Sequence, residues 1–74
     1  MSKLPAVRPG DIARVARRIG FVLDRQKGSH AIYFRERDRA RVVIPMHSRD
    51  LKPGTLHGLI EDLGITRDEF LALL

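Results

Sequence analysis

The sequence predicts an α+β fold, a two-layer sandwich in which helices cover one face of a three-stranded antiparallel sheet. Two observations support this prediction. Apolar residues repeat with helical spacing near the start of the chain and again after residue 53, whereas residues 21–45 alternate or form short β-rich runs. Helices segregated to one face bury both patterns, and they leave the other face of the sheet open.

The first helix is expected to follow Pro9 and to end at Gly20, after a flexible lead-in of residues 1–8 that shows no periodicity. Asp11 lies near its start, where a carboxylate suits the helix dipole. Its apolar residues have the i, i+3, i+4, i+7 spacing of an amphipathic helix: Ile12, Val15, Ala16 and Ile19.

Three strands are expected next, over residues 21–27, 30–35 and 41–45. Gly28-Ser29 forms the first turn, and the second turn, residues 36–39, is charged and contains no glycine. Simple alternation along the first strand puts four residues on one face: Phe21, Leu23, Arg25 and Lys27.

Two helices complete the predicted chain. Pro53 suits the first turn of the longer one, which stops at Gly64, and the Thr66 and Glu69 pair is a capping box that starts a short last helix. The order of elements is that of the double-stranded-RNA-binding domain, with the short C-terminal helix added. This architecture favours RNA binding only by analogy.

Length and composition indicate one small domain over residues 1–74, without cysteines and therefore without disulfides or thiolate chemistry. No signal peptide or membrane span is recognisable, so we expect a soluble cytoplasmic protein. The net charge is +5, and residues 1–52 carry thirteen of the fourteen Lys and Arg residues. A polyanion is the expected partner class, although arginine that only keeps a small domain soluble is an alternative.

His30 is the strongest catalytic candidate in the sequence. It starts the second strand, and the proposed hairpins bring basic residues near it, as RNA cleavage requires: Arg25, Lys27 and Arg41. An imidazole with an unperturbed pKa of about 6.5 can take the proton of a 2′-hydroxyl near neutrality. The alternative is a half-exposed structural histidine, because alternation puts His30 on the face of Ile32 and Phe34, which could be the buried one.

The other histidines are weaker candidates. His47, in the loop after the third strand, could be a second proton-transfer group, a phosphate contact or a solvated residue, and His57 is expected to be exposed and idle. The three histidines lack familiar ligand spacing and no carboxylates are paired, so we expect metal-free chemistry without a cofactor. Lys52, before a helix N-terminus, offers either a phosphate seat or ordinary capping.

The chain resembles the HicA toxins of toxin–antitoxin modules in short motifs spread over nearly its whole length. These motifs are Gly20-Phe21, Arg25-Gln26-Lys27-Gly28-Ser29-His30, Ile32-Tyr33, Val43-Ile44-Pro45-Met46-His47 and Leu51-Lys52-Pro53-Gly54-Thr55-Leu56. Gly-Ser-His after an Arg-Gln-Lys strand is a specific combination. The chain departs from the usual family pattern at Ala31 and in the turn at 36–39, where relatives usually have a glycine.

The resemblance implies an mRNA interferase that cleaves transcripts without a metal and is held inactive by its antitoxin, HicB. The catalytic role of the motif histidine carries over to His30, and His47 matches a Pro-x-His position with a supporting role. The residues expected to bind RNA or stabilise phosphate charge are Arg25, Lys27, Ser29, Arg41, His47 and Lys52. The alternatives are a noncatalytic RNA-binding module and a protein-interaction domain whose basic face docks an acidic partner.

Overall fold

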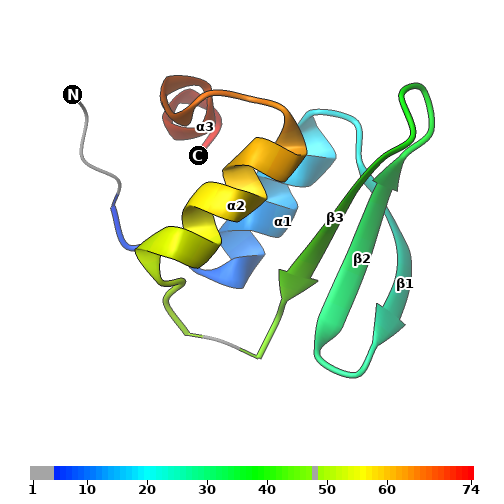
Figure 1. Ribbon diagram of the computed structural model, residues 1–74, viewed down its shortest axis with the longest axis horizontal. Coiled ribbons are helices and arrows are strands. Elements are labelled where there is room, and N and C mark those ends of the chain that lie inside the picture. The colour runs from blue at the N-terminus through cyan, green and yellow to red at the C-terminus, as the bar shows by residue number, and fades with distance from the viewer. Residues whose placement is uncertain (1–4, 48) are drawn as a thin grey trace.

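The computed structural model describes residues 5–47 and 49–74 and confirms the predicted α+β two-layer sandwich (Figure 1). The strands form one antiparallel sheet in the order β1-β2-β3, and helices α1 and α2 lie on the same side of it. The elements are α1 (Pro9–Arg18), β1 (Val22–Lys27), β2 (His30–Arg35), β3 (Ala40–Pro45), α2 (Pro53–Leu63) and α3 (Arg67–Leu73).

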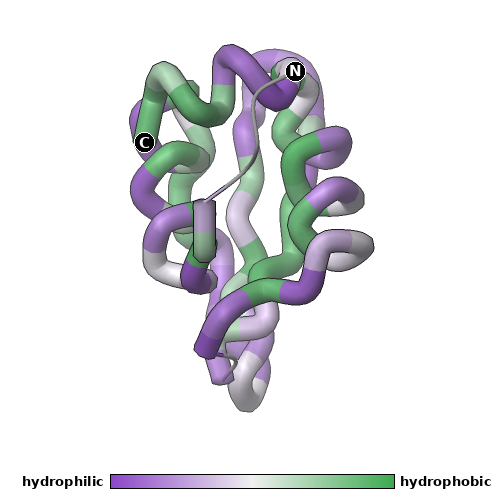
Figure 2. The backbone as a smooth tube through the Cα atoms, turned by 90° about the vertical axis from the view of Figure 1, so that its left-hand side faces the viewer, coloured by the Kyte–Doolittle hydropathy of each residue, from purple (hydrophilic) through white to green (hydrophobic). Residues whose placement is uncertain are grey.

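The hydrophobic core lies between the helices and one face of the sheet. Figure 2 looks onto the helical layer, where apolar and polar segments alternate along the chain as expected for helices with one buried face. From the sheet, Ala31, Tyr33, Val42 and Ile44 are buried. The largest fully buried side chains elsewhere are Phe21, Phe70, Ile12, Leu63, Val7 and Val15.

Helix α1 begins and ends close to the predicted positions. The Asp11 carboxylate accepts a hydrogen bond from the Arg8 backbone N–H at 3.0 Å and one from Arg14 Nη2 at 3.1 Å. The Arg8 N–H bond, followed by the contacts with Arg14, lowers the pKa of Asp11 below its ordinary value, and partial desolvation opposes the shift. Asp11 therefore stabilises the helix start in its ionised form.

The prediction of a flexible lead-in over residues 1–8 is wrong at Val7, which belongs to the core. Val7 is only 1% exposed within the core, and its carbonyl oxygen accepts a hydrogen bond from the Leu51 N–H at 2.8 Å. Residues 1–4 lie outside the described residues. A single apolar residue has no periodicity of its own, so the contact between the segment before α1 and the segment before α2 left no pattern in the sequence.

Strand β1 differs from the prediction in both its start and its faces. It begins at Val22, because Phe21 is buried and still bonds to the helix through its N–H and the Ala16 carbonyl at 3.0 Å. A β-bulge between Leu23 and Arg25 then shifts the register against β2. Leu23 consequently shares a face with Tyr33 rather than with Arg25, so the prediction of an unbroken alternation was wrong.

The glycine-free turn between β2 and β3 is closed by a side chain. Arg35 forms a two-point ion pair with Asp38, at 3.0 and 2.8 Å, and its Nη1 donates to the Ile19 carbonyl at 2.8 Å. The same guanidinium lies 4.5 Å above the Phe21 ring. Arg39 takes the left-handed conformation, with φ of 60°, where a glycine would be unstrained. The hairpin therefore forms despite its unusual sequence.

The C-terminal helices follow the prediction closely. Helix α2 ends at Gly64, which has a φ of 78°. The expected capping box of α3 is present: the Thr66 hydroxyl accepts from the Glu69 N–H at 3.1 Å, and the Glu69 carboxylate accepts from the Thr66 N–H at 2.8 Å. Phe70, one position further on, is completely buried and joins this short helix to the core.

Candidate functional site

His30 lies on the sheet face that no helix covers. Its β2 neighbours at odd positions, Ala31 and Tyr33, are buried against the helices, so alternation turns His30, Ile32 and Phe34 to the opposite side. His30 itself is exposed. The structure therefore decides the orientation that the sequence left open, because the face shared by His30 and Phe34 is the open one, and the catalytic role of His30 stays a prediction.

His47 lies beside His30. The centroids of the two imidazole rings are 6.3 Å apart, in an edge-to-face arrangement with an angle of 71° between the ring planes. The backbone brings them together: His30 is opposite Pro45 in the sheet, and the Met46 N–H donates to the Ser29 carbonyl at 2.7 Å. Both histidines are exposed.

Two of the predicted phosphate-binding residues lie on the same open face in β1. Lys27 is directly opposite His30 in the antiparallel register, and Arg25 is opposite Ile32 one row further along. Directly opposite residues on one face have Cβ atoms roughly 5 Å apart, so the Lys27 ammonium can reach a group bound at His30. Arg25 contacts the Asp24 carboxylate at 3.5 Å, and both side chains are well exposed.

Arg41 shares this face but lies farther from His30 than predicted. It is opposite Phe34, which lies four positions after His30 in β2, or roughly 13 Å along the strand. Ser29 is next to His30 in the turn, where its carbonyl holds the Met46 backbone. The structure therefore groups Ser29, Lys27 and His47 around His30, and it places Arg41 at the other end of the face.

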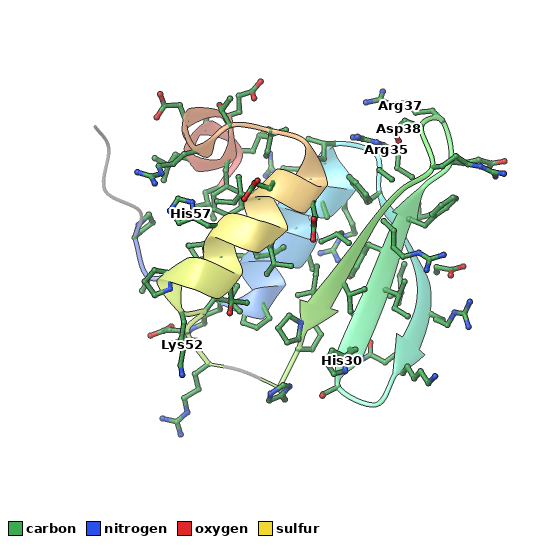
Figure 3. The ribbon with its side chains drawn as sticks, in the orientation of Figure 1. His30, Arg35, Arg37, Asp38, Lys52 and His57 are labelled. Carbon is green, nitrogen blue, oxygen red and sulfur yellow. The ribbon has the colours of Figure 1, made fainter. Side chains whose placement is uncertain are left out.

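Lys52 and His57 belong to the helical layer instead. Lys52 is the exposed N-cap of α2, and Figure 3 shows it across the connecting segment from His30. His57 projects from α2 on the side away from the sheet. Its Nε2 lies 2.9 Å from Arg67 Nη2, so this exposed histidine has a partner and the expectation of an idle residue was incomplete.

Sequence reasoning overlooked the apolar part of the open face. Ile32 and Phe34 lie outside the core cluster, and Val43, opposite Ile32, is 40% exposed. We use "open face" for these three apolar residues together with His30 and the flanking bases Arg25, Lys27 and Arg41. The signal was present in the strand alternation, but alternation does not reveal which face the helices cover.

Shifted pKa values occur at the end of the sheet opposite His30. Hydrogen bonding to Arg35 lowers the pKa of Asp38, and the same bond raises the pKa of Arg35. Figure 3 shows this pair at the β2–β3 turn, far from the labelled His30. Arg35 is occupied by Asp38 and the Ile19 carbonyl, so its charge closes the hairpin and is not part of the open face.

The described part of the chain has neither a cluster of metal-ligating side chains nor a membrane-spanning helix. Across residues 5–47 and 49–74, no three His, Asp or Glu side chains are grouped closely enough to ligate a metal ion. Of the helices in these residues, none has the length and apolar character needed to cross a membrane.

Comparison with known proteins agrees with the fold and the motifs. No curated protein matches the sequence. A family model described as the HicA toxin of bacterial toxin–antitoxin systems matches residues 10–65. These residues include the whole sheet, His30, His47 and the start of the segment after α2. Because this match spans well over half of the 74 residues, the chain belongs to the HicA family and is the toxin of a bacterial toxin–antitoxin pair.

Proposed function

We propose that this toxin is a metal-independent endoribonuclease that cleaves mRNA at a site formed by His30 and His47. The observation that carries the proposal is the 6.3 Å separation of the two imidazole rings on an open, basic sheet face. Two imidazoles can supply both proton transfers that phosphodiester cleavage needs, and Lys27 lies opposite His30 to attract the phosphate.

In the first half of the reaction, His30 acts as the general base. Its neutral imidazole takes the proton from the 2′-hydroxyl of the ribose, and the 2′-oxygen forms a bond to the adjacent phosphorus. Negative charge increases on the non-bridging phosphate oxygens in this step. The Lys27 ammonium opposite His30 stabilises that charge, and Arg25, one row further along, contributes more weakly because Asp24 partly neutralises it.

In the second half, His47 acts as the general acid. The bond from phosphorus to the 5′-oxygen breaks, and protonated His47 gives its proton to the departing 5′-oxygen. The products are a 2′,3′-cyclic phosphate and a free 5′-hydroxyl, and the two histidines end with exchanged protonation states. Each proton transfer is worth about 10²- to 10⁴-fold in rate, which is enough for a toxin that needs only occasional cuts.

The antitoxin partner is proposed to be HicB, which blocks the site by covering the basic surface around His30. Residues 1–52 carry thirteen basic and five acidic residues, a charge that favours fast association with an acidic protein surface. We expect the association rate to fall as salt is added. An association rate that does not change with salt would exclude electrostatic steering of the antitoxin.

The cleavage proposal is tested with an end-labelled single-stranded RNA and excess EDTA. The parent, His30→Ala and His57→Ala are compared after circular dichroism has shown that all three are folded. His57 is the matched control, since it is an exposed histidine on the helical layer. We expect cleavage by the parent and His57→Ala and at least a 10²-fold loss in His30→Ala. Intact RNA that stays bound to the parent would instead identify a noncatalytic RNA-binding module.

A further inference from the structure

We infer that the open face is a track for single-stranded RNA, with Phe34 as a stacking platform for a base at a distance from the cleavage site. The inference deepens the proposed function and rests on it for the position of the scissile phosphate at His30. It assigns a ligand contact to Phe34, which lies outside the sequence motifs and outside the predicted phosphate-binding residues.

The strand register arranges the open face as an apolar centre between two basic edges. Ile32 and Phe34 come from the central strand β2, whereas the cations come from the edge strands: Arg25 and Lys27 from β1, and Arg41 from β3. The register places Arg41 directly opposite Phe34. The centre can therefore receive rings or other flat apolar groups while the edges contact negative charge.

No helix covers this face, because the helices pack on the other side of the sheet (Figure 1), and Ile32 and Phe34 at its centre are half-buried. Val22, which is opposite Phe34 in β1, is 63% exposed, and Val43, opposite Ile32, is 40% exposed. Exposed apolar residues gathered on one face of a small domain are characteristic of an interaction surface. The carboxylate at its margin, Asp24, already contacts Arg25.

Charge and chemistry favour RNA as the occupant. Bases of a single strand present apolar faces that stack on aromatic side chains, and the phosphates run alongside where arginine and lysine can neutralise them. A duplex keeps its bases stacked inside, so it would leave Phe34, Ile32 and Val43 without contacts. The open face therefore suits an unpaired strand, although the order of elements is that of a domain that binds duplex RNA.

The track continues into the catalytic site. Phe34 and His30 point to the same side of β2 and are four residues apart, about 13 Å along the strand. A strand whose base stacks on Phe34 can follow β2 to the histidine pair, passing Arg25 on the way. Stacking of a base on Phe34 thus holds the strand at a fixed distance from the scissile bond, and in this way the surface contributes to where the RNA is cut.

The test measures RNA binding in a His30→Ala background, so that the RNA stays intact. Fluorescence anisotropy of a labelled single strand and of the matched duplex is followed for Phe34→Leu and Arg41→Ala. Phe34→Tyr keeps the ring and controls for Phe34→Leu. Arg18→Ala removes an exposed arginine from helix α1 and controls for Arg41→Ala. Thermal melts establish that each variant is folded.

We expect the single strand to bind more tightly than the duplex. Phe34→Leu should weaken single-strand binding by about fivefold or more, while Phe34→Tyr stays within about twofold of the background protein. Arg41→Ala should make the slope of log affinity against log salt less negative by about 0.7, the value for one phosphate contact on a single strand. Arg18→Ala should leave that slope unchanged.

Three results would overturn the inference. Equal RNA affinity of Phe34→Leu and Phe34→Tyr would remove the stacking role. A salt dependence that becomes less steep in Arg18→Ala but not in Arg41→Ala would put the RNA on the helical layer. Absence of RNA binding near physiological salt would make the face a protein-docking surface. Cleavage by the parent distinguishes the two proposals. If the parent binds RNA on the open face without cutting it, the proposed ribonuclease activity is refuted. If the parent cuts RNA and Phe34→Leu leaves binding unchanged, only the proposed RNA path over the open face is refuted.

Discussion

The rings of His30 and His47 lie edge to face with their centroids 6.3 Å apart, although the residues come from different segments of the chain. One starts the central strand, and the other follows the end of β3. Antiparallel pairing of these strands places Pro45 opposite His30, so the loop that carries His47 begins beside it. The pair offers the proposed site two imidazoles instead of one.

His47→Ala should separate the role of the acid from that of the base. We expect it to slow cleavage of ordinary RNA by about 10²-fold or more, because the departing 5′-oxygen loses its proton donor. RNA with sulfur in place of that 5′-oxygen has a leaving group that needs no proton. Single-turnover rates on this RNA should be nearly equal for His47→Ala and the parent, whereas His30→Ala should stay slow. Failure of the sulfur substrate to rescue His47→Ala would remove it from the acid role.

Arg39→Gly should stabilise the β2–β3 hairpin. Arg39 has a φ of 60°. This left-handed conformation is unfavourable for a residue with a Cβ atom and unstrained for glycine. We expect the free energy of unfolding to rise by up to about 1 kcal/mol, measured by urea denaturation. Arg37→Gly removes the same charge from the same turn at a residue without positive φ, and it should be neutral or destabilising. An unstable Arg39→Gly would contradict the assigned strain.

Asp11→Ala should destabilise the fold at neutral pH by about 0.5–1 kcal/mol, through loss of the capping contact and of a carboxylate at a helix N-terminus. The hydrogen bond from Arg8 lowers the pKa of Asp11 from 3.8 in the folded protein. Its contribution is therefore complete above the unfolded value and is lost as pH falls through the lower folded value. Unfolding curves of parent and variant should converge below about pH 4.

The matched control for this pH series is Asp62→Ala, at an exposed carboxylate on α2. It should show a smaller stability difference than Asp11→Ala at neutral pH. A gap between parent and Asp11→Ala that stays constant from pH 7 to below pH 4 would show that the ionised carboxylate of Asp11 is not what stabilises the helix start.

Val7→Ala should lower the free energy of unfolding by roughly 1–3 kcal/mol, because it leaves space in a filled core. Val7 is 1% exposed, and its carbonyl holds Leu51 at the entry to α2. The neighbouring Ala6 is exposed, so Ala6→Ser should change stability by less than about 0.5 kcal/mol. If both variants are equally stable, Val7 does not contribute to the core, and residues 5–8 are a peripheral lead-in.

Much of the architecture is predictable because its signals are local. The apolar spacing of α1, the β-rich run of β2 and the Thr66–Glu69 capping box each depend on residues a few positions apart, and each element is present close to its expected bounds. His30 is likewise visible in the sequence as an imidazole among basic residues, and its catalytic role stays a prediction. The family match agrees with the motifs on which that prediction rests.

The errors share a different cause. The bulge near Asp24 and the burial of Val7 depend on contacts between segments distant in the sequence, and periodicity within one segment does not record them. Arg35 is a further example. Its guanidinium donates hydrogen bonds to Asp38 and to the Ile19 carbonyl in the folded hairpin, and the sequence does not show these partners. A basic residue in a sequence is therefore a candidate phosphate contact only until its partners in the fold are known.

The sequence by itself determined the kinds of element, their order and the residue types available for proton transfer, because these follow from local periodicity and side-chain chemistry. Only the tertiary structure decided which face of the sheet is open and that His47 joins His30. Alternation divides a strand into two equivalent faces, and packing of the helices against Ala31, Tyr33 and their neighbours makes one of them the core. The other face is left to water and to the ligands of the protein.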